Sequence, residues 1–372
     1  MKTTRKQLIE SGIELFSSKA FDEVSISEVC KTAELSNGIF YKYFENKEEF
    51  YKELLKEAID RIEAYLLNIE GETIKERLKD FIKKNLNLTK KEFKLIKIYR
   101  DGQYKFLEFE KEIKLVYNKA LEKIYERKIS IYEHFFIMSP IRFINIYYIS
   151  RELEPDIDFL VKVLLYGFLH KTKKDISSLD EGMFYLRVPF NSSNMKCKIL
   201  NVSTEMLSTQ KYSSITVNDI TERVGIAAGT FYLYFKNKDS LLKSSINRIK
   251  KQVLYFLKDC YNPEETPLDN HIKFLYLLFE YYKDSSFKYK LIREIEMIDN
   301  LLYQRCLDNE VELYLDTLEK LNCNYERKRV IAIILLGIAH YMGIECFYLK
   351  SFSDRKEFLE NIKYFLQNGI EN

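Results

Sequence analysis

The chain has 372 residues, and its composition, 46% hydrophobic and 31% charged, excludes extended disorder and suits two or more folded domains. The net charge of +3 is too small to indicate nucleic acid by itself, and the 11 Gly and 5 Pro are few enough to predict an all-α fold. Six singly spaced Cys and a polar start without a signal-peptide pattern predict a reduced, cytoplasmic protein.

An internal repeat divides the chain. Residues 25–50 and 216–241 align without a gap at an offset of 191, and Gly38/Gly229 is one of several identical pairs. Further along, 121–123 matches 318–320, and 165–170 matches 335–340. The last offset is 170, which predicts that the first copy carries extra residues between about 124 and 155.

Each copy has the pattern of a helix-turn-helix. After an amphipathic first helix, Ser25 or Thr216 opens a short helix with a capping box, and a second short helix follows a tight turn. Asn46 and Asn237 are expected to be the N-caps of a third, long helix. Four aromatic residues are expected in the core: Phe40, Phe44, Phe231 and Phe235. Three such helices form a common DNA-reading module.

The second short helix carries a recognisable signature in both copies. Residues 33–50 read A-E-L-S-N-G-I-F-Y-K-Y-F-E-N-K-E-E-F, and residues 224–241 read V-G-I-A-A-G-T-F-Y-L-Y-F-K-N-K-D-S-L. Both runs resemble the signature of the TetR/AcrR family of transcriptional regulators, and the resemblance covers about 45 residues per unit. It implies an all-α fold of two units, each with a three-helix DNA-binding domain and a helical bundle for ligand sensing and dimerisation.

The repeat and the resemblance together predict the domain organisation. We expect a DNA-binding domain over 1–65, a helical regulatory domain over 66–174 and a linker over 175–194. A second DNA-binding domain over 195–257 and a second regulatory domain over 258–372 follow. At about 3.3 Å per residue, the linker is long enough to return the chain to the DNA-facing end of the next unit.

Two kinds of DNA contact are expected. Glycines allow a close approach to the backbone, and Tyr hydroxyls and Lys ammonium groups bind phosphate, although the Tyr could instead be core. The positions that differ between the two copies, which also include Ile39 and Leu233, would read bases. The predicted DNA-binding residues are Ser25, Ser36, Asn37, Gly38, Tyr41, Lys42, Tyr43, Lys47, Thr216, Ala227, Ala228, Gly229, Thr230, Tyr232, Tyr234 and Lys238. Because the two reading helices differ, a pseudo-palindromic or asymmetric operator follows as a hypothesis.

The two copies also differ in charge. Residues 1–60 hold 9 Lys and Arg against 12 Asp and Glu, a net charge of −3. Residues 192–251 hold 10 against 4, a net charge of +6, which is typical of a DNA-binding surface. Either one unit anchors the protein on DNA and the other discriminates between DNA sequences, or one unit has lost DNA binding.

The remaining sequence predicts long amphipathic helices. In the first unit they are expected over 73–88, 90–100, 106–137 and 156–174. In the second they are expected over 267–284, 286–322 with a break near Asp299, 325–350 and 353–368. Their many Tyr and Phe would line a cavity for a small-molecule effector or simply pack the bundle.

Residues 330–349 form a mostly apolar stretch that is long enough to cross a membrane. Glu345 within it makes that location costly, so we expect burial in the dimer interface that the resemblance implies, and no membrane. The matching residues Gly167 and Gly337 would allow close helix approach there, and His170 and His340 would lie in the interface or touch a ligand. The two units would then pair within one chain as a pseudo-dimer, or the chain would form a homodimer.

No cluster of His, Cys and acidic residues has metal-ligand spacing, and no nucleotide-binding or catalytic motif is present. We therefore expect no metal, no cofactor and no enzyme activity. The leading hypothesis is a repressor that binds double-stranded operator DNA and is released from it by a small-molecule effector. The alternatives are an interaction or ligand-buffering protein that has lost DNA binding, and a membrane-tethered regulator.

Overall fold

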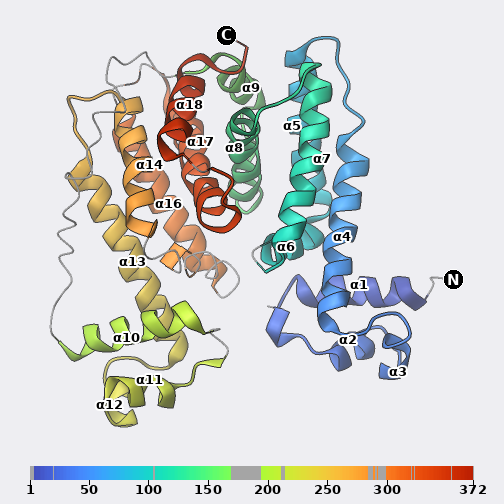
Figure 1. Ribbon diagram of the computed structural model, residues 1–372, viewed down its shortest axis with the longest axis vertical. Coiled ribbons are helices and arrows are strands. Elements are labelled where there is room, and N and C mark those ends of the chain that lie inside the picture. The colour runs from blue at the N-terminus through green and yellow to red at the C-terminus, as the bar shows by residue number, and fades with distance from the viewer. Residues whose placement is uncertain are drawn as a thin grey trace. The chain divides into compact units, whose positions relative to one another are not determined.

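The computed structural model describes residues 4–19, 21–103, 105–168, 194–210, 214–283, 288, 289, 291, 299–319, 321, 323–352 and 354–371, and their regular structure is entirely helical (Figure 1). Contacts divide the chain into two units, Met1–Leu169 with Asn322–Asn372 and His170–Leu321. The second unit contains α10 (Met195–Thr209), α11 (Val217–Val224), α12 (Ala228–Tyr232), α13 (Lys238–Cys260), α14 (Pro267–Lys283) and α16 (Asn300–Thr317).

The first unit contains helices from both halves of the sequence. From the first repeat come α1 (Thr4–Phe16), the short 3-10 helix η1 (Phe21–Glu23), α2 (Ile26–Thr32), α3 (Asn37–Phe40), α4 (Lys47–Leu66), α5 (Ile74–Lys91), α6 (Phe93–Gly102), α7 (Leu107–Tyr125), α8 (Ile131–Ile149) and α9 (Ile157–Tyr166). From the end of the second repeat come α17 (Tyr325–Gly343), the π-helix η5 (Ile344–Leu349) and α18 (Arg355–Asn368). By packing, residues 322–372 therefore belong with the first repeat.

The helix expected over 106–137 was wrong, because two helices occupy this region and the second runs on to Ile149. Glu126 ends α7 in the left-handed conformation, with φ +56°, and Ser130 opens α8 with a complete capping box to Glu133. The sequence did not reveal α8 because it is buried on most of its circumference, so it lacks the apolar stripe of an amphipathic helix.

The alignment of 165–170 with 335–340 was also wrong. Gly337 lies inside α17, whereas Gly167 ends α9, so the two glycines are not equivalent. The counterpart of Gly167 is Gly369, which ends α18 with nearly the same φ, +70° against +68°. Consequently α8 and α9 correspond to α17 and α18, and the first copy has no large insertion.

Helices α8, α9, α17 and α18 pack together within the first unit. A Cβ atom on Gly337 would lie 2.8 Å from Cβ of Phe143 and 3.2 Å from the carbonyl oxygen of Ser139, so α17 touches α8 closely at this glycine. His340 packs one turn further on, with its ring centroid 4.9 Å from that of Phe143. Its predicted partner His170 lies outside the described residues.

The ends of α9 and α18 interlock. A Cβ on Gly167 would meet the backbone of Gln367, and a Cβ on Gly369 would meet the backbone of Leu165. Backbone hydrogen bonds join the two turns, from Phe168 N to Leu366 O at 3.0 Å and from Ile370 N to Leu164 O at 3.0 Å. Because the positive φ and the lack of space both exclude a side chain, glycine is required at each turn.

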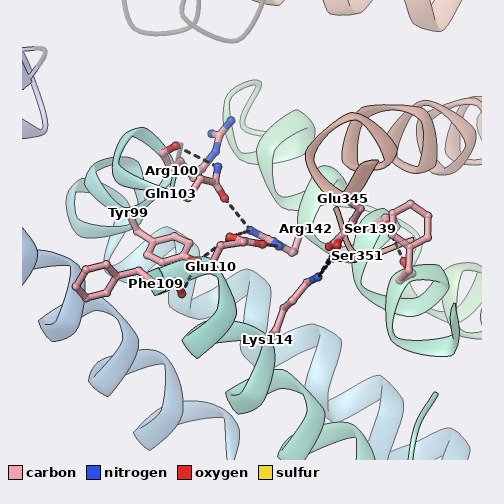
Figure 2. A network of polar contacts seen from close by, with 11 residues as sticks. Tyr99, Arg100, Gln103, Phe109, Glu110, Lys114, Ser139, Arg142, Glu345 and Ser351 are labelled. Atoms are coloured by element: carbon pink, nitrogen blue, oxygen red, sulfur yellow. Dashed lines mark hydrogen bonds and ion pairs between the residues drawn. The ribbon is translucent and has the colours of Figure 1, made fainter. Parts of the chain in front are cut away.

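A buried polar network also ties η5 to the first repeat (Figure 2). Arg142 of α8 donates to both carboxylate oxygens of Glu110 in α7, at 2.6 and 3.1 Å, and to Gln103 at 2.9 Å. Although burial alone lowers the pKa of Arg142, the Glu110 carboxylate holds it well above its usual value. Lys114 forms an ion pair with the buried Glu345, which explains a charge inside an apolar helix.

The apolar helix Tyr325–Leu349 is the one stretch of the described residues that is long and apolar enough to cross a membrane, and 83% of its apolar window is buried inside the protein. This burial agrees with the expectation that the segment serves packing. The Glu345–Lys114 pair provides the charge compensation that a bilayer would not.

The close contact at Gly337 gives the first testable prediction. Substitution Gly337→Ala should lower the free energy of unfolding by about 1–3 kcal/mol, because the new methyl group overlaps Phe143. Alanine has a higher helix propensity than glycine, so a loss of stability can be attributed to the packing clash. Urea denaturation measures it, with Gly229→Ala, which meets nothing within 4 Å, as the matched control. Equal stability of the two variants would contradict the close approach.

The turn between α2 and α3 gives a second prediction. Glu34 adopts a positive φ of +57°, and its counterpart in the second repeat is Gly225 with φ +77°. Substitution Glu34→Gly should therefore stabilise the protein, by about 0.5–1 kcal/mol. Thermal unfolding measures this effect, with Glu45→Gly as the control. Glu45 is exposed, lies outside the helices and has no positive φ, so glycine there should only destabilise the protein. A lower melting temperature for Glu34→Gly would refute the strain argument.

Candidate nucleic-acid interface

Each repeat builds a helix-turn-helix from local signals. Ser25 and Thr216 cap α2 and α11, and each exchanges hydrogen bonds with the acidic residue three positions on, Glu28 or Asp219. The backbone then turns in the same way in both copies, with Leu35 N donating to Cys30 O at 2.9 Å and Ile226 N donating to Thr221 O at 3.0 Å. The short helices α3 and α12 follow, and these are the candidate reading helices.

The aromatic residues of the reading helices divide between core and surface as predicted. Phe40, Phe44, Phe231 and Phe235 are buried, with at most 4% of each exposed. The tyrosines between them are outside: Tyr41 is 58% exposed, Tyr43 43%, Tyr232 56% and Tyr234 41%. Core packing therefore does not explain these four tyrosines, and their hydroxyl groups are available to a partner.

The glycines of the reading helices face open space. The nearest atom to a Cβ on Gly38 would be the Ser36 hydroxyl at 3.9 Å, and a Cβ on Gly229 would meet nothing within 4 Å. Neither residue has a positive φ. The fold itself does not require glycine at these positions, and the open space beside each one would admit a closely approaching molecule.

Several predicted contact residues have structural roles. Lys47 donates from Nζ to the carbonyl oxygens of Phe21 and Val24, both at 3.0 Å, and Lys238 donates to Ile215 O at 2.8 Å. These lysines thus hold the loop before α2 or α11 against the start of the long helix. Sequence reasoning missed this role, because the acceptors lie 23 or 26 residues earlier in the chain. Their contact with phosphate stays a prediction.

Ser25 and Thr216 are likewise occupied as helix caps. An ion pair with Lys19, together with the hydrogen bonds from Ser25, lowers the pKa of Glu28 to about 2, so its carboxylate stays charged at neutral pH. Thr216 lowers the pKa of Asp219 in the same way. Both caps therefore persist at neutral pH and hold the first turns of α2 and α11, the helices that precede the candidate reading helices.

The candidate base-reading side chains differ between the copies. In the first, Ser36, Asn37 and Lys42 are exposed, and the Ser36 hydroxyl makes no cap hydrogen bond. In the second, Ala227 and Ala228 are exposed and Thr230 is half-buried. Leu233, at the position of Lys42, is 79% exposed. One surface offers hydrogen-bonding groups and the other offers methyl groups, which suit the thymine methyl.

Comparison with known proteins identifies these domains. A family described as "Bacterial regulatory proteins, tetR family" matches at residues 8–54 and again at 199–244. The chain carries two TetR-type DNA-binding domains in tandem. The two matched segments include the helix-turn-helix of each repeat, which confirms the resemblance that the signature runs indicated.

Curated relatives resemble the TetR domains over part of their length. An uncharacterised HTH-type transcriptional regulator, YvdT of Bacillus subtilis, is 31% identical over 100 residues, which make up 26% of this chain and 52% of that protein. A second, YuxN of the same organism, is 34% identical over 19% of this chain and 24% of that protein. The chain thus spans about a quarter to a half of these relatives.

Solved structures of TetR-type regulators are similar to one half of the chain. One from Aquifex aeolicus is 24% identical, covers 46% of this chain and 98% of its own, and has a TM-score of 0.38. FadR from Bacillus subtilis in complex with stearoyl-CoA is 18% identical over 46% of this chain and 98% of its own, with a TM-score of 0.40.

The open faces of the two glycines give a third prediction. Gly38→Ala and Gly229→Ala should each leave the free energy of unfolding unchanged within about 0.5 kcal/mol or raise it, because the added methyl group meets no packed neighbour. Each should nevertheless weaken DNA binding, because the methyl group holds the helix away from the phosphates. Unfolding curves and DNA titrations on the same samples separate the two effects. Unchanged affinity for both variants would show that DNA does not approach these faces.

Proposed function

We propose that this protein is a DNA-binding transcriptional regulator with two non-identical reading helices in one polypeptide. The observation that carries the proposal is the repeated surface of α3 and α12, where two exposed tyrosines follow a glycine with an open face. Hydroxyls beside a close-approach point are suited to the phosphate backbone, which positions a protein on DNA without specifying the sequence. Function here is binding rather than catalysis.

We propose further that the chain is an intramolecular pseudo-dimer. In TetR-like proteins, a helix near the C-terminus is expected to pair in a four-helix dimer interface. Here α8 and α9 of one repeat pack with α17 and α18 of the other, and the turns at Gly167 and Gly369 contact each other reciprocally. These contacts support pairing within one chain at the surface that would otherwise pair two chains. A single molecule would present two reading helices to two half-sites about 34–36 Å apart.

The regulatory role is proposed as repression that a small-molecule effector relieves in the cytoplasm. Relatives of the chain include the fatty acid metabolism regulator protein of Bacillus subtilis, 30% identical over 22% of this chain. An effector that binds one helical domain would favour a spacing of the reading helices that no longer fits the operator, which is a population shift. The operator would be asymmetric, because the two reading surfaces differ in chemistry.

A DNA titration tests this proposal directly. The purified chain selects its operator from random duplexes, and fluorescence anisotropy then compares it with Tyr41→Phe/Tyr43→Phe and with Tyr232→Phe/Tyr234→Phe. Each double variant should lose about tenfold or more in affinity, since each removes hydroxyl hydrogen bonds to charged phosphates. Tyr255→Phe/Tyr325→Phe, which alters two exposed tyrosines outside both helix-turn-helices, is the matched control and should bind as the wild type does.

Light scattering of the complex completes the test. One chain per operator supports the pseudo-dimer, whereas two chains per operator support a homodimer that presents four reading helices. If neither double variant changes the affinity, or if no duplex is selected, DNA binding through these helices is refuted.

A second candidate function rests on the charge difference. Residues 1–60 carry a net charge of −3, which opposes binding to phosphate, whereas residues 192–251 carry +6. In this alternative the first unit has lost DNA binding and acts as an interaction or ligand-binding module. The same titration decides, because only Tyr232→Phe/Tyr234→Phe would then weaken binding.

A further inference from the structure

The two helix-turn-helix domains differ in charge along one edge, where the first helix of each domain meets the segment that follows the reading helix. Four aligned positions at an offset of 191 define this edge: Arg5/Lys196, Glu45/Lys236, Glu49/Ser240 and Glu53/Ser244. They carry a net charge of −2 in the first repeat and +2 in the second. Four positions thus account for almost half of the charge difference between residues 1–60 and 192–251.

In the first repeat this edge is acidic, and its one cation is neutralised. Arg5 of α1 lies with Cζ 5.7 Å from the centroid of the Phe44 ring and forms an ion pair with Glu53 of α4. The carboxylate of Glu49 accepts a hydrogen bond from the backbone N of Glu45, just before α4. The side chain of Glu45 is exposed. Three carboxylates around one paired cation leave the edge negative, so it repels a phosphate group.

In the second repeat the same edge is basic. Lys196, near the start of α10, is exposed, and its Nζ lies 5.8 Å from the centroid of the Phe235 ring, which corresponds to Phe44. Lys236 follows Phe235 directly and is also exposed. Neither lysine has an acidic partner in the part of the chain that the structure describes. The carboxylate that neutralises the cation of the first repeat is replaced by the hydroxyl of Ser244.

Serines carry out the structural roles at this edge without a charge. The Ser240 hydroxyl accepts a hydrogen bond from the backbone N of Asn237 at 3.1 Å, so it serves the start of α13 as the Glu49 carboxylate serves the start of α4. The Ser244 hydroxyl donates to Ser240 O at 2.7 Å. The fold therefore does not require carboxylates here, and the charge of this edge bears on partners rather than on packing.

The two lysines lie on either side of an exposed tyrosine of the reading-helix surface. Tyr234 is 41% exposed and directly precedes Phe235, whose ring lies beside Lys196, and Lys236 comes next in the chain. Ammonium groups and a phenolic hydroxyl are donors that proteins direct at the phosphates of DNA. Because lysine binds phosphate as a point charge, such contacts do not depend on the base sequence.

We propose that Lys196 and Lys236 form an anion site for the DNA backbone beside the second reading helix, and that the first helix-turn-helix has no such site, because Glu45, Glu49 and Glu53 repel phosphate there. The second domain then provides most of the sequence-independent affinity. The first contributes the polar side chains of α3, and its phosphate contacts are left to its tyrosine hydroxyls. That the phosphates belong to DNA rests on the function proposed above, whereas the anion site does not.

The salt dependence of binding tests this proposal, because each phosphate contact that is lost lowers the slope of log affinity against log salt concentration by about one. The full chain is titrated with a duplex of random sequence, and anisotropy is measured at several salt concentrations. Lys196→Gln/Lys236→Gln should reduce the slope by about two. The matched control, Lys111→Gln/Lys162→Gln, removes the same charge at exposed positions outside both helix-turn-helices and should leave the slope unchanged.

A reciprocal variant gives the first domain residues of the second. Glu45→Lys/Glu53→Ser should raise the slope by at least about one, because it adds a lysine and releases Arg5 from its ion pair. Its control, Glu122→Lys/Glu112→Ser, makes the same changes at exposed positions of α7. Circular dichroism checks that each variant folds. Misfolding does not produce a gain in binding, so the reciprocal variant carries the test if the lysine variant is unstable.

Equal slopes for the lysine variant and its control, or no gain in the reciprocal variant, overturn the proposal. If the tyrosine variants weaken operator binding while these variants match their controls, this inference alone fails. If no duplex binds, the same variants are titrated with inorganic polyphosphate, which offers phosphate without bases. A loss there that is confined to Lys196→Gln/Lys236→Gln retains the anion site and refutes the regulator, whereas equal binding by all variants refutes both.

Discussion

The packing of α8 and α9 with α17 and α18 is the constraint on which the rest of the first unit depends. At Gly337 two helices approach so closely that a methyl group would overlap Phe143, and at Gly167 and Gly369 two turns exclude any side chain. These contacts join segments about 200 residues apart in the sequence. The charged groups follow from this packing, because Arg142 and Glu345 are buried by it and must find Glu110 and Lys114 as partners.

The two copies keep what holds the helix-turn-helix together and change what faces outward. The capping boxes, the buried phenylalanines and the lysine that holds the preceding loop recur in both. The exposed residues diverge, with Lys42 in one copy and Leu233 in the other. A polypeptide that carries both reading helices is free to diverge in this way, because it is not bound by the symmetry that identical subunits impose on their operator.

The interiors of the two repeats differ as well. In the first repeat, Arg77 spans the space between α5 and α7, and Leu78 is packed beside it. In the second, Asn270 and His271 stand at the corresponding positions and line a cavity of about 300 Å³. The two interiors therefore differ in how completely side chains fill them.

The sequence by itself determined the all-α class, the position of both helix-turn-helices and the exposure of their tyrosines. These depend on caps, turns and apolar spacing within about 45 residues, where local physics acts directly. Tertiary structure alone decided the rest. The helix α8 is apolar around most of its surface and so has no periodicity to detect, and the short match of 165–170 to 335–340 misplaced the repeat. The contacts of Lys47, the interlocked glycines and the cavity at His271 join residues distant in the chain, and only folding brings such residues together.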